Sequence, residues 1–232
     1  MKSFLFKFWW LILLLVALPL PWLLPPLRPF RLSDIVLLTP PRHLTEKSVI
    51  ALSGLHRGDN LLRLSLKKVH DRLLSSPWIE GVALAKAFPG RLVISLEEQE
   101  PVALIQWNGL HLVNREGKIF KKLEGRDPKN LPIITGLKKG KEQEVAGLVG
   151  IIRSFYEQEL LRTVGLSEIH WDESKGVVLF TLRPVVKAIL GKEEWDKRID
   201  RLSGILPEVL NAKTKNLSID LTYNKRVFLK GG

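Results

Sequence analysis

The sequence predicts an α+β protein with an N-terminal transmembrane helix, a β-α-α-β-β module, and a distal mixed α/β domain whose antiparallel-rich sheet is packed by helices. Three observations predict this organisation. Residues 8–24 form an apolar run without charge. Residues 77–103 contain two alternating segments around a Pro-Gly turn. Beyond residue 140, two stretches with apolar residues at helical spacing are interspersed with strand patterns.

The N-terminus predicts a retained membrane anchor. Residues 8–24 are 17 uncharged residues, and at about 1.5 Å per residue they span roughly 25 Å, which is the short end for a membrane helix. We expect residues 1–7 to be a short cytoplasmic tail and the proline-rich residues 25–31 to be a linker. A cleaved signal peptide is the alternative, but no clean small-x-small cleavage site supports it. Tryptophans stand at both ends of the run, as in interfacial aromatic belts: Trp9, Trp10 and Trp22.

Residues 32–100 predict a module in the order β-α-α-β-β. The first strand is expected over residues 32–38. Thr45 is suited to cap a short helix that runs to Leu52, and Gly54 is suited to end it. Ser65 is suited to cap a second helix that runs to about Leu74.

The last two strands of this module are expected on either side of the turn Phe88-Pro89-Gly90-Arg91. Leu92, Ile94 and Leu96 alternate with polar or smaller residues, which is the period of a half-buried strand. Pro101 cannot donate to a strand ladder, so the pairing should stop there or step to a new sheet.

The distal domain is expected over residues 101–224, with a C-terminal strand and tail over 225–232. Asn108-Gly109 predicts a tight hairpin. Helices are expected over 141–164 and 193–210. The first of these helices is expected to turn one apolar face inward: Val145, Leu148, Val149, Ile152, Tyr156 and Leu160. Strands are expected over 102–107, 110–113, 118–120, 169–171, 177–182, 185–190, 217–223 and 227–229.

The composition narrows the classes of partner. The chain has 232 residues, no cysteine and a formal net charge of +12, so disulfides and thiolate metal sites are excluded. A basic chain of this kind suits nucleic acid, acidic partner proteins or anionic lipid. Lys and Arg are spread along the whole chain rather than gathered in one arm, which disfavours nucleic acid.

The candidate catalytic and metal-binding residues favour structural roles. The five histidines show no metal-ligand spacing. Ser65-Leu66-Lys67-Lys68 fits the S-x-x-K nucleophile motif, but its partner motifs are missing and Ser65 suits a helix cap. Glu97 and Glu98 face opposite ways on a strand, so they cannot flank one bond. Trp78 and Trp107 are read as core residues rather than stacking platforms. We therefore predict no catalysis, cofactor, metal or small-molecule substrate.

A set of short motifs, taken in order, resembles the FtsQ/DivIB family of bacterial division proteins. Each motif is weak alone, and their order over roughly two hundred residues is specific. The resemblance implies that residues 32–100 form a POTRA domain, the β-α-α-β-β module of that family. The residues that carry its structural motifs are Gly58, Asn60, Pro77, Trp78, Phe88, Pro89, Gly90, Glu98 and Pro101.

The distal segment is also similar to that family, through Lys187 to Gly191, Trp195 and Ile219 to Tyr223. Relatives commonly carry a basic residue where Thr222 stands, so the local surface chemistry departs from the family here. The cytoplasmic tail of about seven residues is short for the family, so contacts usually assigned to that tail are in doubt.

The end of the chain is the predicted binding site. A terminal strand often lies at a sheet edge, where its free N–H and C=O groups accept an extended segment of a partner by β-augmentation. The resemblance implies that the partners are the small coiled-coil division proteins FtsB and FtsL, which connect to the septal cell-wall synthases. The residues expected to bind them are Leu221, Tyr223, Asn224, Lys225, Arg226, Val227 and Phe228.

The resulting hypothesis is a non-catalytic scaffold at the division septum, anchored in the bacterial inner membrane with its C-terminal domains outside the cytoplasm. Three alternatives stay open. The last strands complete the sheet without binding anything, or the chain is a POTRA-bearing assembly or secretion factor, or it is an envelope enzyme acting on peptidoglycan. The assembly factor would carry repeated POTRA modules or a C-terminal barrel, and neither pattern is seen in the sequence.

Overall fold

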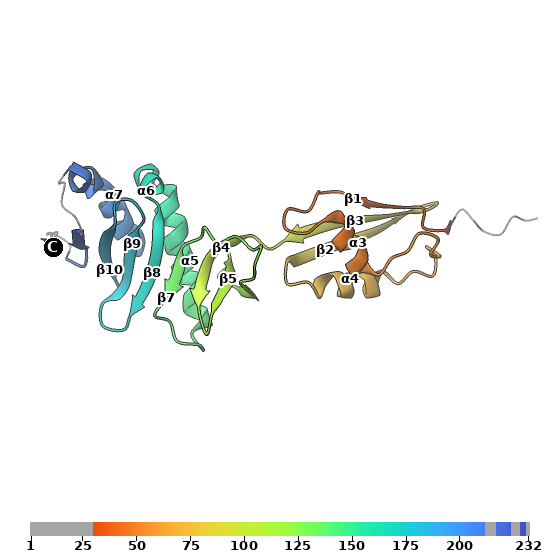
Figure 1. Cartoon of the computed structure of the whole chain (residues 1–232), viewed down its shortest axis with the longest axis horizontal. Helices are drawn as coiled ribbons and strands as arrows, with labels where there is room; N and C mark the ends of the chain where they lie inside the picture. The colour runs from red at the N-terminus through yellow and green to blue at the C-terminus, as the bar shows by residue number, and fades with distance from the viewer. Residues whose placement is uncertain (1–29, 212–216, 224–227, 231–232) are drawn as a thin grey trace, which may run out of the picture. The chain divides into compact units, whose positions relative to one another are not determined.

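The computed structural model of the chain describes residues 30–211, 217–223 and 228–230. The chain divides into two compact units, Met1–Glu98 and Gln99–Gly232, each an α+β arrangement (Figure 1). The predicted anchor at residues 8–24 lies outside the described residues. Among those that are described, no helix has both the length and the apolar character needed to cross a membrane.

The N-terminal unit has the predicted order β-α-α-β-β. Strand β3 lies between the other two strands of its sheet, parallel to β1 and antiparallel to β2. Both helices pack against this three-stranded sheet (Figure 1). The elements are β1 (Asp34–Leu37), α3 (Glu46–Ser53), α4 (Leu66–Leu74), β2 (Ile79–Ala87) and β3 (Arg91–Glu98).

The predicted helix caps are confirmed. The Thr45 hydroxyl accepts a hydrogen bond from the backbone N–H of Ser48 at 3.1 Å, and the Ser65 hydroxyl accepts one from Lys68 at 3.4 Å. Gly54 ends α3 with φ = 64°, a left-handed conformation that favours glycine. The serine of the S-x-x-K motif is therefore used at the start of a helix.

The N-terminal unit has its own apolar core, in which the inward residues of β3 meet both helices. The fully buried residues of this core include Leu32, Val49, Leu61, Leu73, Leu92 and Ile94. Burying a leucine or valine side chain stabilises a fold by about 1.5–3 kcal/mol before the entropy of ordering is counted. Because its core is separate from that of the rest of the chain, the unit meets the definition of a domain.

The C-terminal unit is built on a nine-stranded sheet in the order β12-β11-β10-β9-β8-β7-β4-β5-β6. Three strand pairs are parallel and five are antiparallel, so the expected antiparallel-rich sheet is confirmed. Its strands are β4 (Pro101–Gln106), β5 (Leu110–Asn114), β6 (Ile119–Lys122), β7 (Ile133–Thr135), β8 (Leu166–Asp172), β9 (Gly176–Thr181), β10 (Val186–Gly191), β11 (Leu217–Asp220) and β12 (Phe228–Lys230).

Helices α5 (Glu142–Glu157), α6 (Glu159–Val164) and α7 (Trp195–Asn211) cover one face of this sheet (Figure 1). Phe155 of α5 is the largest fully buried side chain among the described residues, and it lies in the core between helices and sheet. The prediction for Pro101 is also confirmed, since β3 ends the first sheet at Glu98 and β4 begins the second sheet at Pro101.

The prediction of a single helix over residues 141–164 is wrong. The backbone of Gln158 is extended, with φ = −80° and ψ = 118°, and it separates α5 from α6. The break changes which residues of the last turns face inward: Leu161 and Val164 are buried, whereas Leu160 is exposed. Apolar spacing alone did not reveal the break, because no glycine or proline marks it.

Strand β7 was not expected. It has only three residues and pairs in parallel with β4 on one side and β8 on the other. Both neighbours are distant in sequence, so the pairing that makes this segment a strand is tertiary. A three-residue segment is too short to show a period.

Candidate protein-binding edge

Strand β12 is the terminal strand of the nine-stranded sheet. It runs antiparallel to β11, with Ser218 opposite Lys230, Ile219 opposite Leu229 and Asp220 opposite Phe228. On its outer side, no strand of the described chain pairs with it. An edge of this kind presents backbone N–H and C=O groups to an added strand.

Helix α7 donates hydrogen bonds to the backbone at the end of β10 and just after β11, through three side chains at a spacing of three residues. The Trp195 indole N–H donates to the carbonyl of Gly191 at 3.0 Å. The Arg198 guanidinium donates to the carbonyl of the preceding residue, Leu190, also at the end of β10. Arg201 donates to the carbonyl of Tyr223 at 2.6 Å. One helix face therefore fixes both the end of β10 and the segment that follows β11.

Sequence reasoning missed this role of α7. It assigned Trp195 to the core and gave no role to the two arginines. The signal that was available is the recurrence of donor side chains at positions 195, 198 and 201, on the helix face that meets the sheet.

A local turn follows β11. The Asp220 carboxylate accepts hydrogen bonds from the backbone N–H of Thr222 at 2.9 Å and from its hydroxyl at 2.6 Å. Thr222 also lies against Gly191, because a Cβ added to that glycine would stand 3.1 Å from the threonine methyl group. Thr222 thus closes a turn and packs on the end of β10.

The residues predicted to bind a partner fall into three groups. Leu221 is fully buried and donates its backbone N–H to the carbonyl of Ile189, so its side chain lies in the core and offers no binding surface. Tyr223 is 57% exposed and is the predicted contact that the structure places on the surface. The other predicted residues either lie outside the described part of the chain (Asn224, Lys225, Arg226, Val227) or are described by their backbone in β12 (Phe228).

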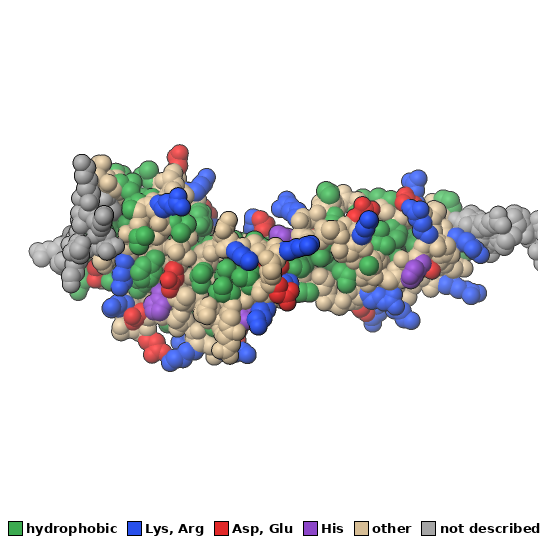
Figure 2. Space-filling model, in the orientation of Figure 1, with side chains coloured by type: hydrophobic (Ala, Val, Ile, Leu, Met, Phe, Trp, Pro, Cys, Tyr) green, Lys and Arg blue, Asp and Glu red, His purple; other side chains and the backbone are tan. Residues whose placement is uncertain are grey.

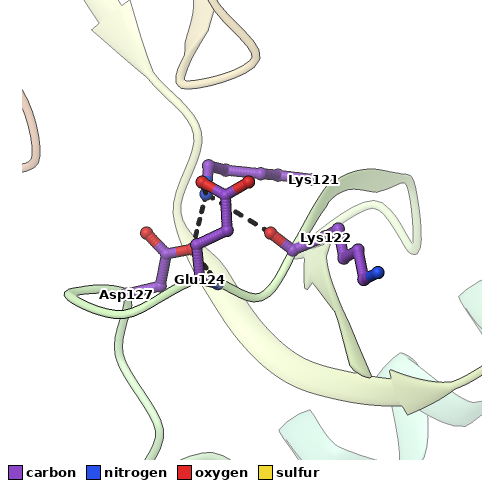
Figure 3. Close-up of polar contacts among 4 residues, drawn as sticks. All are labelled: Lys121, Lys122, Glu124 and Asp127. Carbon is purple, nitrogen blue, oxygen red and sulfur yellow. Dashed lines mark hydrogen bonds and ion pairs between the residues drawn. The ribbon is translucent and has the colours of Figure 1, made fainter. Parts of the chain in front are cut away.

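The opposite edge of the sheet, at β6, is covered by an ion-pair network. Figure 3 shows the Lys121 ammonium among the carboxylates of Glu124 and Asp127 and the backbone carbonyl of Lys122. The Lys121 and Asp127 side chains are 14% and 10% exposed, and their charged atoms are 2.6 Å apart. Glu124 also donates its backbone N–H to Asp127 at 2.8 Å, which closes the loop after β6.

The environment of Lys121 stabilises its charge. Burial by itself would lower the pKa of the ammonium, but the hydrogen bonds to Asp127 and Glu124 outweigh burial and hold the pKa above its usual value of 10.5. A charged lysine on an edge strand disfavours pairing with another chain. The two ends of the sheet therefore differ in chemistry.

The histidines and carboxylates of the described residues do not gather into a metal-holding group. Groups of three or more His, Asp and Glu side chains suited to holding a metal are absent from the described residues. His170 contacts the hydroxyl of Thr135 at 2.8 Å through Nδ1, and His43 stacks on Trp78 with ring centroids 4.3 Å apart. These histidines have structural contacts.

Comparison with known proteins gives the family. The profile described as POTRA domain, FtsQ-type, matches residues 30–99, and the profile described as Cell division protein FtsQ/DivIB, C-terminal, matches residues 103–222. The chain belongs to the FtsQ/DivIB family of cell division proteins. The family suggested by the ordered motifs is thereby confirmed.

Individual relatives agree with this assignment. A protein named Cell division protein FtsQ from Geotalea daltonii is 29% identical over 198 residues, which cover 81% of this chain and 71% of the relative. Its namesake from a Geobacter species is 28% identical over 205 residues, covering 85% and 75%. The FtsQ of Coxiella burnetii is 23% identical over 201 residues, covering 86% and 79%.

Several POTRA motif residues hold loops of the N-terminal unit together. The Glu98 carboxylate accepts hydrogen bonds from the backbone N–H groups of Arg42, His43 and Leu44, at 2.8, 2.9 and 3.3 Å. A loop far away in sequence is thereby fixed to the end of β3. Gly58 donates its N–H to Leu32 at 2.8 Å, which joins another loop to the start of the unit.

Other POTRA motif residues shape turns or pack. The Asn60 side-chain oxygen accepts from the backbone N–H groups of Leu62 and Arg63, at 3.0 and 3.3 Å. Trp78 is buried, as predicted, and the preceding Pro77 is exposed. Trp107 of the second unit is partly buried against the core and donates its indole N–H to the carbonyl of Leu137 at 2.9 Å, so its predicted packing role is also confirmed.

Glycine is required at position 90 because the neighbouring atoms leave no room for a side chain. A Cβ at this position would stand 2.7 Å from the backbone oxygen of Arg31 and 2.8 Å from the hydroxyl of Ser33. The glycine lets the turn after Phe88-Pro89 approach the start of β1, where its carbonyl accepts a hydrogen bond from the backbone N–H of Ser33 at 2.8 Å.

Proposed function

We propose that the chain is a membrane-tethered, non-catalytic scaffold of the division machinery. It captures the extracytoplasmic segment of a small FtsB-type division protein, together with FtsL, by strand addition at β12, and it so connects to the septal cell-wall synthases. The observation that carries the proposal is the terminal position of β12 in the sheet. Family membership supports the role in division.

The contrast between the two sheet edges supports β12 as the binding site. At β6, the Lys121 ammonium bonds a carbonyl of its own strand and two loop carboxylates, which disfavours an added strand. At β12, α7 holds the adjoining backbone through Arg201, so less order has to be gained when a partner binds.

The small number of hydrogen bonds that β12 can offer means that capture depends on a membrane tether. Each backbone hydrogen bond contributes about 0.5–1.5 kcal/mol net, and the three described residues of β12 supply few of them. Confinement of both partners to one membrane raises their effective concentration, so a modest intrinsic affinity suffices. Exposed Tyr223 adds side-chain contact at the entrance to this strand.

The proposed topology follows the apolar run. Residues 1–7 are cytoplasmic, 8–24 span the inner membrane, and 25–31 link the anchor to the POTRA domain at 32–100. The distal domain at 101–224 and the strand and tail at 225–232 lie outside the cytoplasm at the septum. A POTRA-bearing assembly factor is the weaker alternative, because residues 103–222 match the C-terminal domain of a division family.

The first test replaces Tyr223 with aspartate in the full chain. We expect capture of the FtsB-type partner to weaken by at least about tenfold, because a charge replaces an aromatic contact at the interface. Leu182→Asp is the matched control, since Leu182 is 52% exposed against 57% for Tyr223 and lies on a different hairpin. The measurement is the dissociation constant, with folding of both variants checked by circular dichroism.

Hydrogen exchange distinguishes strand addition from docking elsewhere. On addition of the partner, the amides of β12 (Phe228–Lys230) should exchange at least about tenfold more slowly, because a new strand protects them. Unchanged exchange in β12 together with full capture by the Tyr223→Asp variant would contradict the proposal.

A further inference from the structure

We propose that the end of the POTRA domain at which the chain enters it binds the surface of an anionic phospholipid bilayer. The inference rests on the membrane tether of the proposed function, and it adds a second, lipid contact made by the folded domain. We name this end the basic tip. Its apolar residues are Phe30, Leu62 and Phe88, and its basic residues are Arg31, Arg57, Arg63, Lys86 and Arg91.

Three loops meet at the basic tip. The entering segment accepts a hydrogen bond at the Phe30 carbonyl from the N–H of Leu61 at 2.8 Å, and Leu32 donates to the Asp59 carbonyl at 2.8 Å. The Phe30 and Phe88 rings pack edge to face with centroids 5.8 Å apart. The β2–β3 turn, the loop after α3 and the entry of the chain thus form one surface.

The basic tip exposes large apolar side chains. Phe88 is 56% exposed and Leu62 is 51% exposed. The Lys86 ammonium reaches the backbone carbonyl of Leu62 at 3.4 Å, which brings a cation next to an exposed leucine. Apolar side chains surrounded by cations are typical of surfaces that rest in the interface of a bilayer.

The positive charge of the domain is concentrated at this end. Residues 30–98 contain ten basic and seven acidic residues, of which the basic tip and its loops hold five basic ones and only two acidic ones, Asp34 and Asp59. The remaining five basic and five acidic residues cancel. Within the described chain, none of the five basic residues forms an ion pair. On the face drawn in Figure 2, Lys and Arg side chains lie at the right-hand end of this domain, with some acidic side chains beside them.

The short connection between the proposed anchor and the domain favours lipid as the binding partner of the basic tip. Phe30 follows the end of the apolar run at Leu24 by six residues, so it lies within about 20 Å of the anchor even when the connection is fully extended. A membrane surface is therefore always within reach of the basic tip. Each basic residue near an anionic bilayer strengthens binding by about fivefold.

The test uses fluorescence in vesicles that hold the full chain. The chain has no cysteine, so Phe88→Cys and, separately, Leu62→Cys each carry one environment-sensitive label. Leu74→Cys is the control: it is exposed and ends α4 near Ile79, which pairs with Glu98 at the far end of the β2–β3 hairpin. The vesicles contain either phosphatidylcholine alone or equal parts of phosphatidylcholine and phosphatidylglycerol, with a quencher on the lipid chains.

We expect the labels at positions 88 and 62 to be quenched at least about twofold more in the anionic vesicles than in the neutral ones, and the label at 74 to be unaffected. Combining either label with Arg57→Glu, Arg63→Glu and Arg91→Glu should remove the difference, while partner capture at β12 is retained. That retention checks the C-terminal unit, and circular dichroism of the purified variant checks that the POTRA domain is folded.

Water-exposed labels at both tip positions in anionic vesicles overturn the proposal. If the chain still resists alkaline extraction and still captures its partner, the proposed function stands and the lipid contact alone is wrong. If alkaline extraction also removes the chain from the vesicles, the proposed membrane anchor is wrong as well. Labels that become shielded only when the protein partner is added identify the basic tip as a protein interface instead.

Discussion

At the residue scale, Glu98 shows how one side chain joins distant parts of the POTRA domain. Its carboxylate accepts three backbone hydrogen bonds from the loop at residues 42–44, whereas neighbouring Glu97 is exposed on the other face of β3. Ionised carboxylates make stronger hydrogen bonds than neutral groups do. The loop leads into Thr45 and α3, so Glu98 also fixes the start of that helix.

We expect Glu98→Gln to lower the free energy of unfolding of the N-terminal unit by about 1–2 kcal/mol, because an amide NH₂ would face backbone donors. Glu97→Gln is the matched control and should change it by less than about 0.5 kcal/mol. Urea unfolding followed by circular dichroism measures both. Equal effects of the two variants would rule out a special role for Glu98.

At the element scale, the two edge strands of the large sheet have opposite surroundings. Strand β6 is followed by a loop that Lys121 ties back through Glu124 and Asp127 (Figure 3). Strand β12 is instead approached by a segment that α7 holds through Arg201. The network at β6 disfavours the addition of another strand, whereas the bond from Arg201 fixes the segment that leads to β12. This difference is the physical basis for proposing that partners bind at β12.

The Lys121 network predicts a pH dependence. Because the pKa of the folded Lys121 lies above 10.5, its contribution to stability is complete below that pH and is lost as the pH rises through the raised value. We expect Lys121→Met to lower the free energy of unfolding by about 2 kcal/mol at neutral pH, since the largely buried Asp127 carboxylate loses its ion-pair partner. The difference from the unmodified chain should shrink above that pH.

The control for Lys121 is Lys118→Met, which removes an exposed lysine from the same hairpin. Urea unfolding across the alkaline range measures both variants. A constant difference between the Lys121 variant and the unmodified chain at every pH would show that the ion pair does not titrate as proposed.

At the scale of the whole molecule, the distribution of charge bears on how fast the proposed partner would associate. The two units have separate cores, one around β3 and one between the nine-stranded sheet and its helices. The net charge of +12 is spread over both. A spread positive charge attracts acidic segments, but only charges close to the binding edge change the rate of a specific encounter.

The charge prediction concerns Lys225 and Arg226, which lie in sequence just before β12. Each change to glutamate lowers the net charge by two, so the double variant falls from +12 to +8. We expect its association rate with the FtsB-type partner to fall by about tenfold at low salt, with a flatter salt dependence. Stopped-flow fluorescence at several ionic strengths measures the rate.

The matched control reverses Lys47 and Lys67, two exposed lysines of the POTRA domain, and reaches the same net charge. Because these charges lie in the other unit, the association rate should remain nearly unchanged. Equal slowing by the two double variants would mean that overall charge, rather than charge near β12, governs the encounter.

The sequence by itself determined the local structure of this protein. The caps at Thr45 and Ser65, the hairpin at Asn108-Gly109 and the step to a new sheet at Pro101 follow from chemistry within a few residues, and all of them are confirmed. The family followed from the order of short motifs. Residue type and spacing carry this information without any distant contact.

Only the tertiary structure decided the break at Gln158, the short strand β7, the burial of Leu221 and the three donors of α7. The pairing of β7, the contact of Leu221 with Ile189 and the bond from Arg201 to Tyr223 join residues that lie far apart in sequence. The same holds for the edge position of β12, which is known only when the order of all nine strands is known. The physical reason is that burial and strand order belong to the packed sheet, whereas caps and turns depend on a few neighbouring residues.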